Sequence, residues 1–193
     1  RGRPARRLAL SENAVGAMSD LEARIAQLER RLGQAEDTLA IHELIVRYGW
    51  AVDLGDAEAV AAVFTPDAEF DVGSGASQVD TRQVVFRGRE QIKRDLVLGA
   101  GHQSLLPDCA HTIGPVVIRS DGDRAEATGY SRIYHREQKG QPGDHTALFR
   151  LGYNRWELAR QPDGRWLIAR RISRVVGDPA AHALFRQGLG HGR

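Results

Sequence analysis

Two polar residues, Asp53 and His111, are set in apolar surroundings where they could transfer protons. Asp53 ends a helical pattern, and its neighbours three and four positions back, Trp50 and Gly49, place it near the apolar face. A carboxylate there needs a partner, because an unpaired buried charge is costly. His111 alternates with apolar residues on one face of a predicted strand, and a histidine can act as a general base near neutral pH. Each residue also has an ordinary interpretation: Asp53 as an exposed acid at a helix end, and His111 as a hydrogen-bonded core residue.

Two further predicted strands carry charged side chains that could meet a ligand. The strand over residues 124–137 has small residues such as Ala125 on one face, followed by His135, which leaves room for a ligand. The polar opposite face of this strand is expected to meet solvent or another subunit. The adjacent pair Arg170 and Arg171 sends one guanidinium to each face of its strand. Whichever enters the interior can hold an anion or an enolate oxygen.

The sequence lacks the motifs of several common kinds of site. It holds no GxGxxG after a strand, no Walker loop, no GxSxG elbow and no HExxH, so we predict no cofactor and no metal. The single cysteine, Cys109, excludes an intramolecular disulfide and a multi-cysteine zinc site, and we assign it to the strand face opposite His111. Aromatic residues make up only 6%, too few for the basic, aromatic stripe of an oligonucleotide-binding surface.

The positive charge of the chain is concentrated at its start. The formal charge is +2 and the pI is about 9.0. Residues 1–17 contain four arginines and one glutamate, which leaves the rest of the chain close to neutral. Because Met18, the only methionine, can serve as a translation start, we expect residues 1–18 to be a basic leader that is flexible or not native. The charge balance therefore gives no reason to expect nucleic acid as a partner.

Neither a membrane span nor a secretory signal is predicted. No apolar run approaches the roughly 18 residues that a spanning helix needs. The apolar stretch in the leader, residues 8–10, is too short for a signal peptide. We therefore expect a cytoplasmic protein.

A narrow apolar stripe follows the leader. Ser19 and Glu22 form a capping-box pattern, which predicts a helix start. Apolar residues then recur at alternating spacings of four and three, with charged residues on the flanks: Leu21, Ile25, Leu28, Leu32, Ala35 and Leu39. Such a stripe is typical of a helix that packs against another subunit or lies along its own domain. We assign residues 19–38 to this N-terminal extension.

The rest of the sequence predicts helices first and an antiparallel meander afterwards. After a helix that ends near Asp53, we expect a short helix from Asp56, a strand over residues 68–72, a loop over 73–81, a helix over 90–98 and a loop over 99–107. Four long strands joined by turn-forming sequences follow, over 109–119, 124–137, 144–160 and 165–176. This order is typical of an α+β domain with helices on one face of a curved sheet. We set its bounds at 39–177, and we expect a short helix and a frayed tail over residues 178–193.

Several of these segments resemble the SnoaL-like branch of the nuclear transport factor 2-like superfamily in order and spacing. The matching segments are residues 40–56, 63–68, 111–114, 121–125, 163–166 and 170–171, within a span of about 38–176. The resemblance implies a cone-shaped, curved antiparallel sheet, an α+β barrel, closed by the N-terminal helices around a pocket. This superfamily includes enzymes, binding proteins and assembly modules, so the fold alone does not decide the function.

Within this superfamily, Asp53 and His111 look like the Asp–His dyad of the scytalone dehydratases and the hexachlorocyclohexane dehydrochlorinases. By resemblance, His111 is the catalytic base, and Asp53 orients it and stabilises its imidazolium form. His135 lies on the strand that carries a second histidine in the dehydratases, two residues out of register. Arg171 matches a pocket arginine of the dehydrochlorinases. The looser matches to pocket-lining residues are Tyr48, Tyr153 and Asn154.

The resemblance predicts a cofactor-independent lyase of the dehydratase type, acting on a small, largely apolar cyclic or polyketide-like molecule. An isomerase or a polyketide cyclase would use the same base and differ in where the proton returns. A third hypothesis is a non-catalytic small-molecule-binding or assembly module of the same fold. We expect a homo-oligomer, either a dimer or a trimer, with a small molecule as partner and neither nucleic acid nor membrane.

Overall fold

The computed structural model describes residues 5–73 and 83–190, with side chains from residue 17 onward apart from Gln83. The chain divides into two compact units, Arg1–Leu39 and Ala40–Arg193. Except for Gly73, the loop predicted over residues 73–81 lies outside the described residues. In the described part of the chain, no helix is both long enough and apolar enough to cross a membrane.

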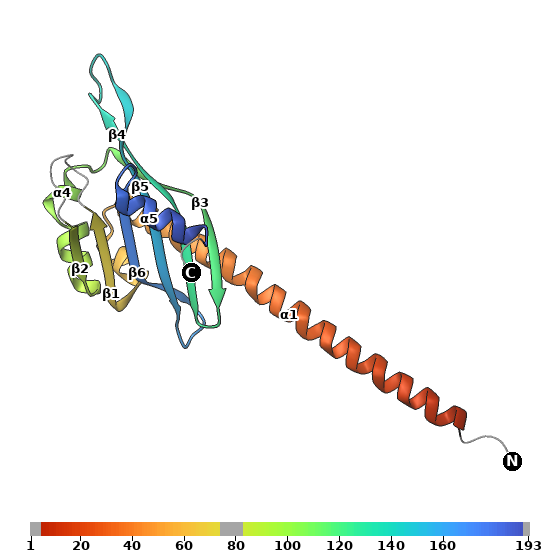
Figure 1. Ribbon diagram of the computed structural model, residues 1–193. Helices are drawn as coiled ribbons and strands as arrows, with labels where there is room; N and C mark the ends of the chain where they lie inside the picture. Colours follow the sequence, from red (N-terminus) through yellow and green to blue (C-terminus); the bar gives the residue numbers. More distant parts are fainter. Residues whose placement is uncertain (1–4, 74–82, 191–193) are drawn as a thin grey trace. The chain divides into compact units, whose positions relative to one another are not determined.

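Helix α1 (Ala5–Asp53) begins in the first unit and ends in the second (Figure 1). The helix start predicted at Ser19 is wrong, because α1 continues through that residue. Serine and glutamate are tolerated inside a helix, and no proline interrupts the sequence there, so the capping-box pattern does not impose a start. Helix α1 therefore also covers residues 5–18 of the predicted leader.

The last turns of α1 bury the broad apolar face that its spacing predicts. Ile41, Ile45, Tyr48 and Val52 are all buried, as expected for one side of a helix that packs on a sheet. Helix α2 (Ala57–Ala62) follows, and Asp56 is its N-cap residue: its Oδ1 accepts a hydrogen bond from the backbone N–H of Ala59 at 2.9 Å.

A single six-stranded curved sheet forms the second unit. Its strands are β1 (Phe64–Gly73), β2 (Gln83–Arg87), β3 (Cys109–Asp121), β4 (Arg124–Glu137), β5 (His145–Arg160) and β6 (Trp166–Val175). Their order is β2-β1-β6-β5-β4-β3, and every neighbouring pair is antiparallel except the parallel pair β1 and β6. The predicted α+β class is confirmed. The sheet is not closed into a barrel, because β2 and β3 remain as its two edges.

Short helices connect and follow the strands. They are α3 (Arg89–Gln91), the π-helix η1 (Ile92–Val97), α4 (Ala100–Gln103) and α5 (Pro179–Gly188). Strand β2 was not predicted from the sequence, and α4 lies in a segment predicted as a loop. The helix predicted over residues 90–98 is present as α3 and η1, and the short helix predicted in the C-terminal segment is α5. Strand β2 and helix α4 are short, so their hydrophobic periodicity is weak and tertiary packing decides their form.

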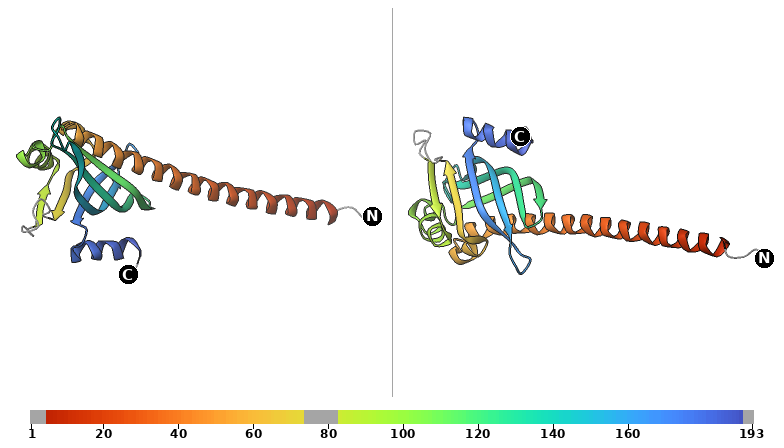
Figure 2. Two further views of the ribbon diagram at one scale, coloured as in Figure 1. Left: turned by 90° about the horizontal axis from the view of Figure 1, so that it is seen from above. Right: turned by 60° about the horizontal axis from the view of Figure 1, so that its bottom comes forward.

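The two faces of the sheet are covered by different helices. Within the second unit, Figure 2 shows α5 on the face opposite the end of α1. The face toward residues 40–53 of α1, here called the inner face, carries the main core, which includes Phe64, Trp156 and Ile168. The face toward α5, here called the outer face, carries a smaller cluster of Tyr153, Ile172, Ala181 and Leu184.

Candidate active site

Asp53 and His111 form a hydrogen-bonded pair between the end of α1 and the start of β3. Oδ1 of Asp53 lies 2.7 Å from Nδ1 of His111. The backbone N–H of His111 also donates to both carboxylate oxygens, at 2.8 and 2.9 Å. A carboxylate oxygen can only accept here, so Nδ1 of His111 carries a proton, and in the neutral form of the ring Nε2 then has the free lone pair. This is the arrangement of a histidine base oriented by a carboxylate.

Gly49 allows α1 to approach β3 closely enough for this pair to form. A Cβ at Gly49 would lie 2.8 Å from the backbone oxygen of His111, which is too close for any other residue without movement. Asp53 follows one turn later on the same side of the helix. The glycine therefore fixes the distance between the helix and the strand that carry the two groups.

A cavity of about 290 Å³ lies beside the pair on the inner face. Much of its wall is apolar, with contributions from α1, β1, η1, β4 and β5 that include Val52, Phe70, Leu96, Ile133 and Phe149. The charged or titratable residues that line it include Tyr48, His102, His111, Arg150 and Arg171. A mostly apolar cavity with a few polar groups is the usual form of a small-molecule site.

Arg171 is a buried cation in the cavity wall, only 6% exposed. Its Nε and Nη2 donate to Oδ1 of Asn154 at 3.1 and 2.9 Å, and its Nη1 donates to the hydroxyl of Tyr48 at 2.5 Å. The guanidinium also lies over the rings of Tyr48, Phe70 and Trp156, 4.8–5.6 Å from their centroids. Burial lowers the pKa of Arg171, but a guanidinium stays charged at neutral pH. Among the described residues, none of its hydrogen-bond acceptors is a carboxylate.

Tyr48 and Arg150 extend this polar part of the wall. Burial raises the pKa of Tyr48 above 10, so its hydroxyl keeps its proton at neutral pH. Burial, together with the charges of Arg171 and Arg174, lowers the pKa of Arg150 to about 10. Nη2 of Arg150 donates to the backbone oxygen of Gly73 at 3.1 Å and to the Ser173 hydroxyl at 3.4 Å. Two guanidinium groups thus line one small cavity, which favours an anionic ligand or transition state.

His102, on α4, places a second imidazole beside His111. The two ring centroids are 5.7 Å apart. Nδ1 of His102 lies 3.0 Å from the backbone oxygen of Val97, and because a carbonyl can only accept, Nδ1 carries the proton. Nε2 of His102 is buried and has no hydrogen-bond partner among the described residues. Burial lowers the pKa of His102, which keeps the ring neutral and its Nε2 an acceptor for a ligand hydroxyl.

Cys109 lies on the same strand face as His111, which corrects its predicted position. The two residues are two positions apart, and side chains at that spacing share a face. Sγ of Cys109 lies 4.0 Å from Oδ1 of Asp53. Possible metal-ligand atoms of Asp53, Cys109 and His111 all lie within 4.8 Å of one another. Burial and the charge of Asp53 raise the pKa of Cys109 to about 11, so the thiol is protonated at neutral pH in this hydrogen-bonded cluster.

The other predicted site residues lie behind or away from the cavity. Asn154 is fully buried and holds Arg171 from behind, while its Nδ2 donates to the Ser131 hydroxyl at 2.6 Å. Tyr153 points to the outer face, where its ring lies 3.8 Å from that of Phe185, because adjacent strand residues face opposite ways. His135 is paired with Cys109 across β3 and β4 and is not among the residues that line the cavity.

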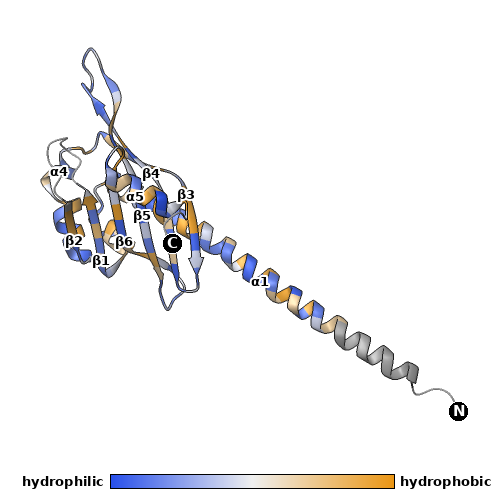
Figure 3. Ribbon diagram, in the orientation of Figure 1, coloured by the Kyte–Doolittle hydropathy of each residue, from blue (hydrophilic) through white to orange (hydrophobic). Residues whose placement is uncertain are grey.

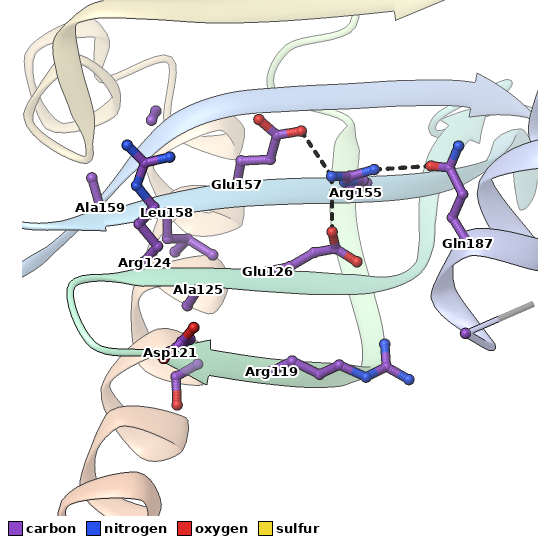
Figure 4. A pocket seen from close by; sticks show the side chains of 13 residues that line it. Arg119, Asp121, Arg124, Ala125, Glu126, Arg155, Glu157, Leu158, Ala159 and Gln187 are labelled. Carbon is purple, nitrogen blue, oxygen red and sulfur yellow. Dashed lines mark hydrogen bonds and ion pairs between the residues drawn. The ribbon is translucent and has the colours of Figure 1, made fainter. Parts of the chain in front are cut away.

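A larger hollow of about 1160 Å³ lies on the outer face, but the cation at its centre is already paired with two carboxylates. Arg155 is central to it: Nη2 lies 2.9 Å from Glu126 and 3.2 Å from Glu157, and Nη1 donates to Gln187 of α5 at 2.9 Å (Figure 4). The residues that Figure 4 labels include no histidine. We therefore place the candidate active site in the smaller cavity.

His102 and Arg150 are the site residues that the sequence did not reveal. His102 lies in the segment predicted as a loop, and its cavity-lining neighbours, Val97, Gly101 and Leu105, recur every four residues. That helical spacing is the one feature of the sequence that could have indicated a helical segment lining the cavity at this point. Arg150 is one of many arginines in the chain, and nothing in its local sequence sets it apart.

Comparisons with known proteins agree with the fold. The family model of the SnoaL-like domain matches residues 33–172. An uncharacterised protein of Mycobacterium tuberculosis is 31% identical over 144 residues, which cover 73% of this chain and 86% of that protein. A crystal structure of a nuclear transport factor 2-like protein with a cystatin-like fold from Novosphingobium aromaticivorans has 34% identity and a TM-score of 0.70, and the match covers 81% of this chain and 94% of that one.

A second structure from Novosphingobium aromaticivorans bears the provisional name of a scytalone dehydratase. It is 20% identical with a TM-score of 0.57, and the match covers 74% of this chain and 86% of that one. At that identity the likeness concerns the fold alone.

Proposed function

This chain belongs to the SnoaL-like family of the nuclear transport factor 2-like fold, and from that premise we propose that it is a cofactor-independent lyase of the dehydratase type. The single observation that carries the proposal is the hydrogen bond between Asp53 and His111 beside a mostly apolar cavity. The proposed substrate is a small, largely apolar cyclic or polyketide-like molecule with a carbonyl group and a β-hydroxyl group. The resemblance of the Asp53–His111 pair to the dyad of the scytalone dehydratases supports the choice of elimination.

The reaction begins with proton removal at the carbon next to the carbonyl group. Nε2 of His111 takes this proton, and the carboxylate of Asp53 stabilises the imidazolium that results. The electron pair of the broken C–H bond moves onto the carbonyl oxygen and forms an enolate. The enolate then expels the β-hydroxyl group, which leaves as water with the proton returned by His111. Substrate thus gives an enone and one water molecule, and His111 is regenerated.

The cations of the cavity act on the enolate oxygen. Arg171 is held by Asn154 and Tyr48 before any ligand arrives, so it stabilises developing negative charge without rearrangement. Arg150 adds a second positive charge to the same cavity. His102 accepts a hydrogen bond from a substrate hydroxyl through its unpartnered Nε2 and so orients the substrate.

Substitutions at the dyad test this proposal on cyclic β-hydroxy ketones, with 3-hydroxycyclohexanone and a two-ring analogue as probes. His111→Gln removes the base, and Asp53→Asn removes the charge that stabilises the imidazolium. We expect each to lower the rate of enone formation, followed by ultraviolet absorbance, by about 10²–10⁴-fold. His182→Gln, at an exposed position on α5, is the matched control and should leave the rate unchanged.

The same samples separate elimination from isomerisation. In D₂O, an isomerase would introduce deuterium at carbon without loss of oxygen, which mass spectrometry detects, whereas the lyase forms an enone. The lyase proposal fails if the unmodified protein does not accelerate enone formation above the rate of His111→Gln, even where it accelerates deuterium exchange. It also fails if His111→Gln turns over at the normal rate.

The predicted cytoplasmic location of the protein stays a prediction.

A further inference from the structure

The first unit presents a row of exposed apolar side chains along one side of α1. Leu21, Ile25, Leu28, Leu32 and Leu39 are 46–69% exposed, and Met18 continues the row toward the N-terminus at 62%. Figure 3 shows apolar residues recurring among polar ones along this part of the helix. A long helix in water gains most of its stability from packing an apolar face. We therefore expect this apolar row to pack against another apolar surface.

We propose that residues 18–39 form a parallel, two-stranded coiled coil with the same segment of a second copy of this chain. The spacing fits a heptad repeat with Met18, Ile25, Leu32 and Leu39 at the a positions and Leu21, Leu28 and Ala35 at the d positions. Ile25 at a, between leucines at d, is the combination that favours two strands. The repeat ends where the two units meet, because the next d position is His42.

Charged residues beside this seam select the orientation of the two helices. The e positions are all acidic, with Glu22, Glu29 and Glu36, and two of the g positions are Arg24 and Arg31. In a parallel pair, each g residue faces the e residue of the following heptad, so Arg24 meets the partner's Glu29 and Arg31 meets the partner's Glu36. In an antiparallel pair, g faces g and e faces e, which would place arginine against arginine and glutamate against glutamate. Charge complementarity therefore favours the parallel pair alone.

The same acidic residues have no opposite charge within reach on their own helix. A side chain on a helix meets residues three and four positions away. None of Glu22, Glu29 and Glu36 has a lysine or arginine at those spacings. Two of these glutamates follow an arginine by five positions, as in Arg24 and Glu29 and in Arg31 and Glu36. Residues five positions apart do not meet on one helix, but they do meet across a parallel pair of helices.

A core substitution tests whether this surface holds two copies together. Sedimentation of the full chain should give a dimer whose dissociation constant rises at least 100-fold in Leu28→Lys. Gln27→Lys adds the same charge one residue away, at a c position on the outside of the pair, and should leave the mass unchanged. A monomeric unmodified chain would overturn the proposal. So would a Leu28→Lys variant that associates as tightly as the unmodified chain, since residues 40–193 would then hold the copies together.

A charge swap and a cysteine pair test the orientation. At low salt, Arg24→Glu with Arg31→Glu should weaken the dimer at least 10-fold, and adding Glu29→Arg with Glu36→Arg should restore it. In a Cys109→Ser background, Leu21→Cys should give disulfide-linked dimers under mild oxidation, while Ala23→Cys, on the outside of the pair, should not. An antiparallel pair would instead tolerate the first double substitution, so the dimer would not weaken. It would also hold the two residues at position 21 about 27 Å apart, so Leu21→Cys would give no disulfide-linked dimer.

Discussion

Two arginines of β6, three residues apart, lie on opposite faces of the sheet in opposite electrostatic settings. Arg174, on the outer face, donates from Nη1 and Nη2 to the two carboxylate oxygens of Asp71, at 2.9 Å each. Arg171, on the inner face, donates to an amide oxygen and a phenol. The first arginine is neutralised by its own chain. The second keeps its charge at the wall of a cavity.

The contrast extends to the hollows on the two faces and shows which one is built for a ligand. The outer hollow is about four times larger, but its central Arg155 already contacts Glu126 and Glu157 (Figure 4). The inner cavity is small and mostly apolar. Its two guanidinium groups, those of Arg150 and Arg171, donate only to neutral groups among the described residues. A buried charge with no opposite charge beside it destabilises the fold, and such charges occur at binding sites, where they interact with the ligand. Charge compensation therefore identifies the site better than size does.

The largest expected effect is on stability, and it should separate the two arginines of β6. Arg174→Met removes the guanidinium that donates to both carboxylate oxygens of Asp71, whose side chain is only 3% exposed. We expect a loss of about 3 kcal/mol in the free energy of unfolding in urea. Arg171→Met removes a buried charge and leaves two neutral acceptors, so its free energy of unfolding should change by no more than about 1 kcal/mol. Equal losses in the two variants would show that the two faces do not differ in this way.

A smaller effect concerns ligand binding at the inner face. The phenolate of 4-nitrophenol resembles an enolate in charge and shape, and its absorbance reports ionisation. Arg171→Met should weaken phenolate binding about 30- to 100-fold, because a buried, preorganised charge on an oxyanion is worth about 2–3 kcal/mol. Arg155→Met, on the outer face, should bind the phenolate as the unmodified protein does. Equal weakening in both variants would move the binding site away from the inner cavity.

The sequence predicted much of the sheet and the dyad, but not the side of the sheet on which some residues lie. Strand β4 was predicted with both of its bounds, and period-two alternation gave the apolar side of His111. Tyr153 and Asn154 were both proposed for the pocket, although adjacent strand residues face opposite ways and only Asn154 reaches the inner face. The pair Arg170 and Arg171 was recognised as pointing both ways. Which arginine turns inward depends on the register of β6 with β1 and β5, and that register is a tertiary property.

The cavity walls outside the strands were beyond sequence reasoning for a related reason. Residues from η1 and α4 line the cavity. A helix was predicted over η1 but without any link to the pocket, and α4 is too short for a clear helical period and was predicted as a loop. His102 became a candidate only because the fold brings its ring 5.7 Å from that of His111. The role of Gly49 was not predicted either, because the backbone oxygen that lies against it belongs to His111, which is distant in the sequence.

The smallest expected effect is the pH dependence of stability that His102 contributes on the inner face. Burial lowers the pKa of His102 below the 6.5 of an unfolded chain, so the unfolded chain takes up a proton first as the pH falls through 6.5. Protonation of the unfolded state destabilises the fold, and the unmodified protein should therefore lose more stability on acidification than His102→Gln does. The difference should be small, because the ring is only half-buried and its bond to Val97 offsets part of the burial. Urea unfolding at several pH values between 7.5 and 5 measures it, with the exposed His182→Gln as control. If His102→Gln and the unmodified protein follow parallel pH curves, His102 is not held neutral by the cavity, and its role as a hydrogen-bond acceptor loses its support.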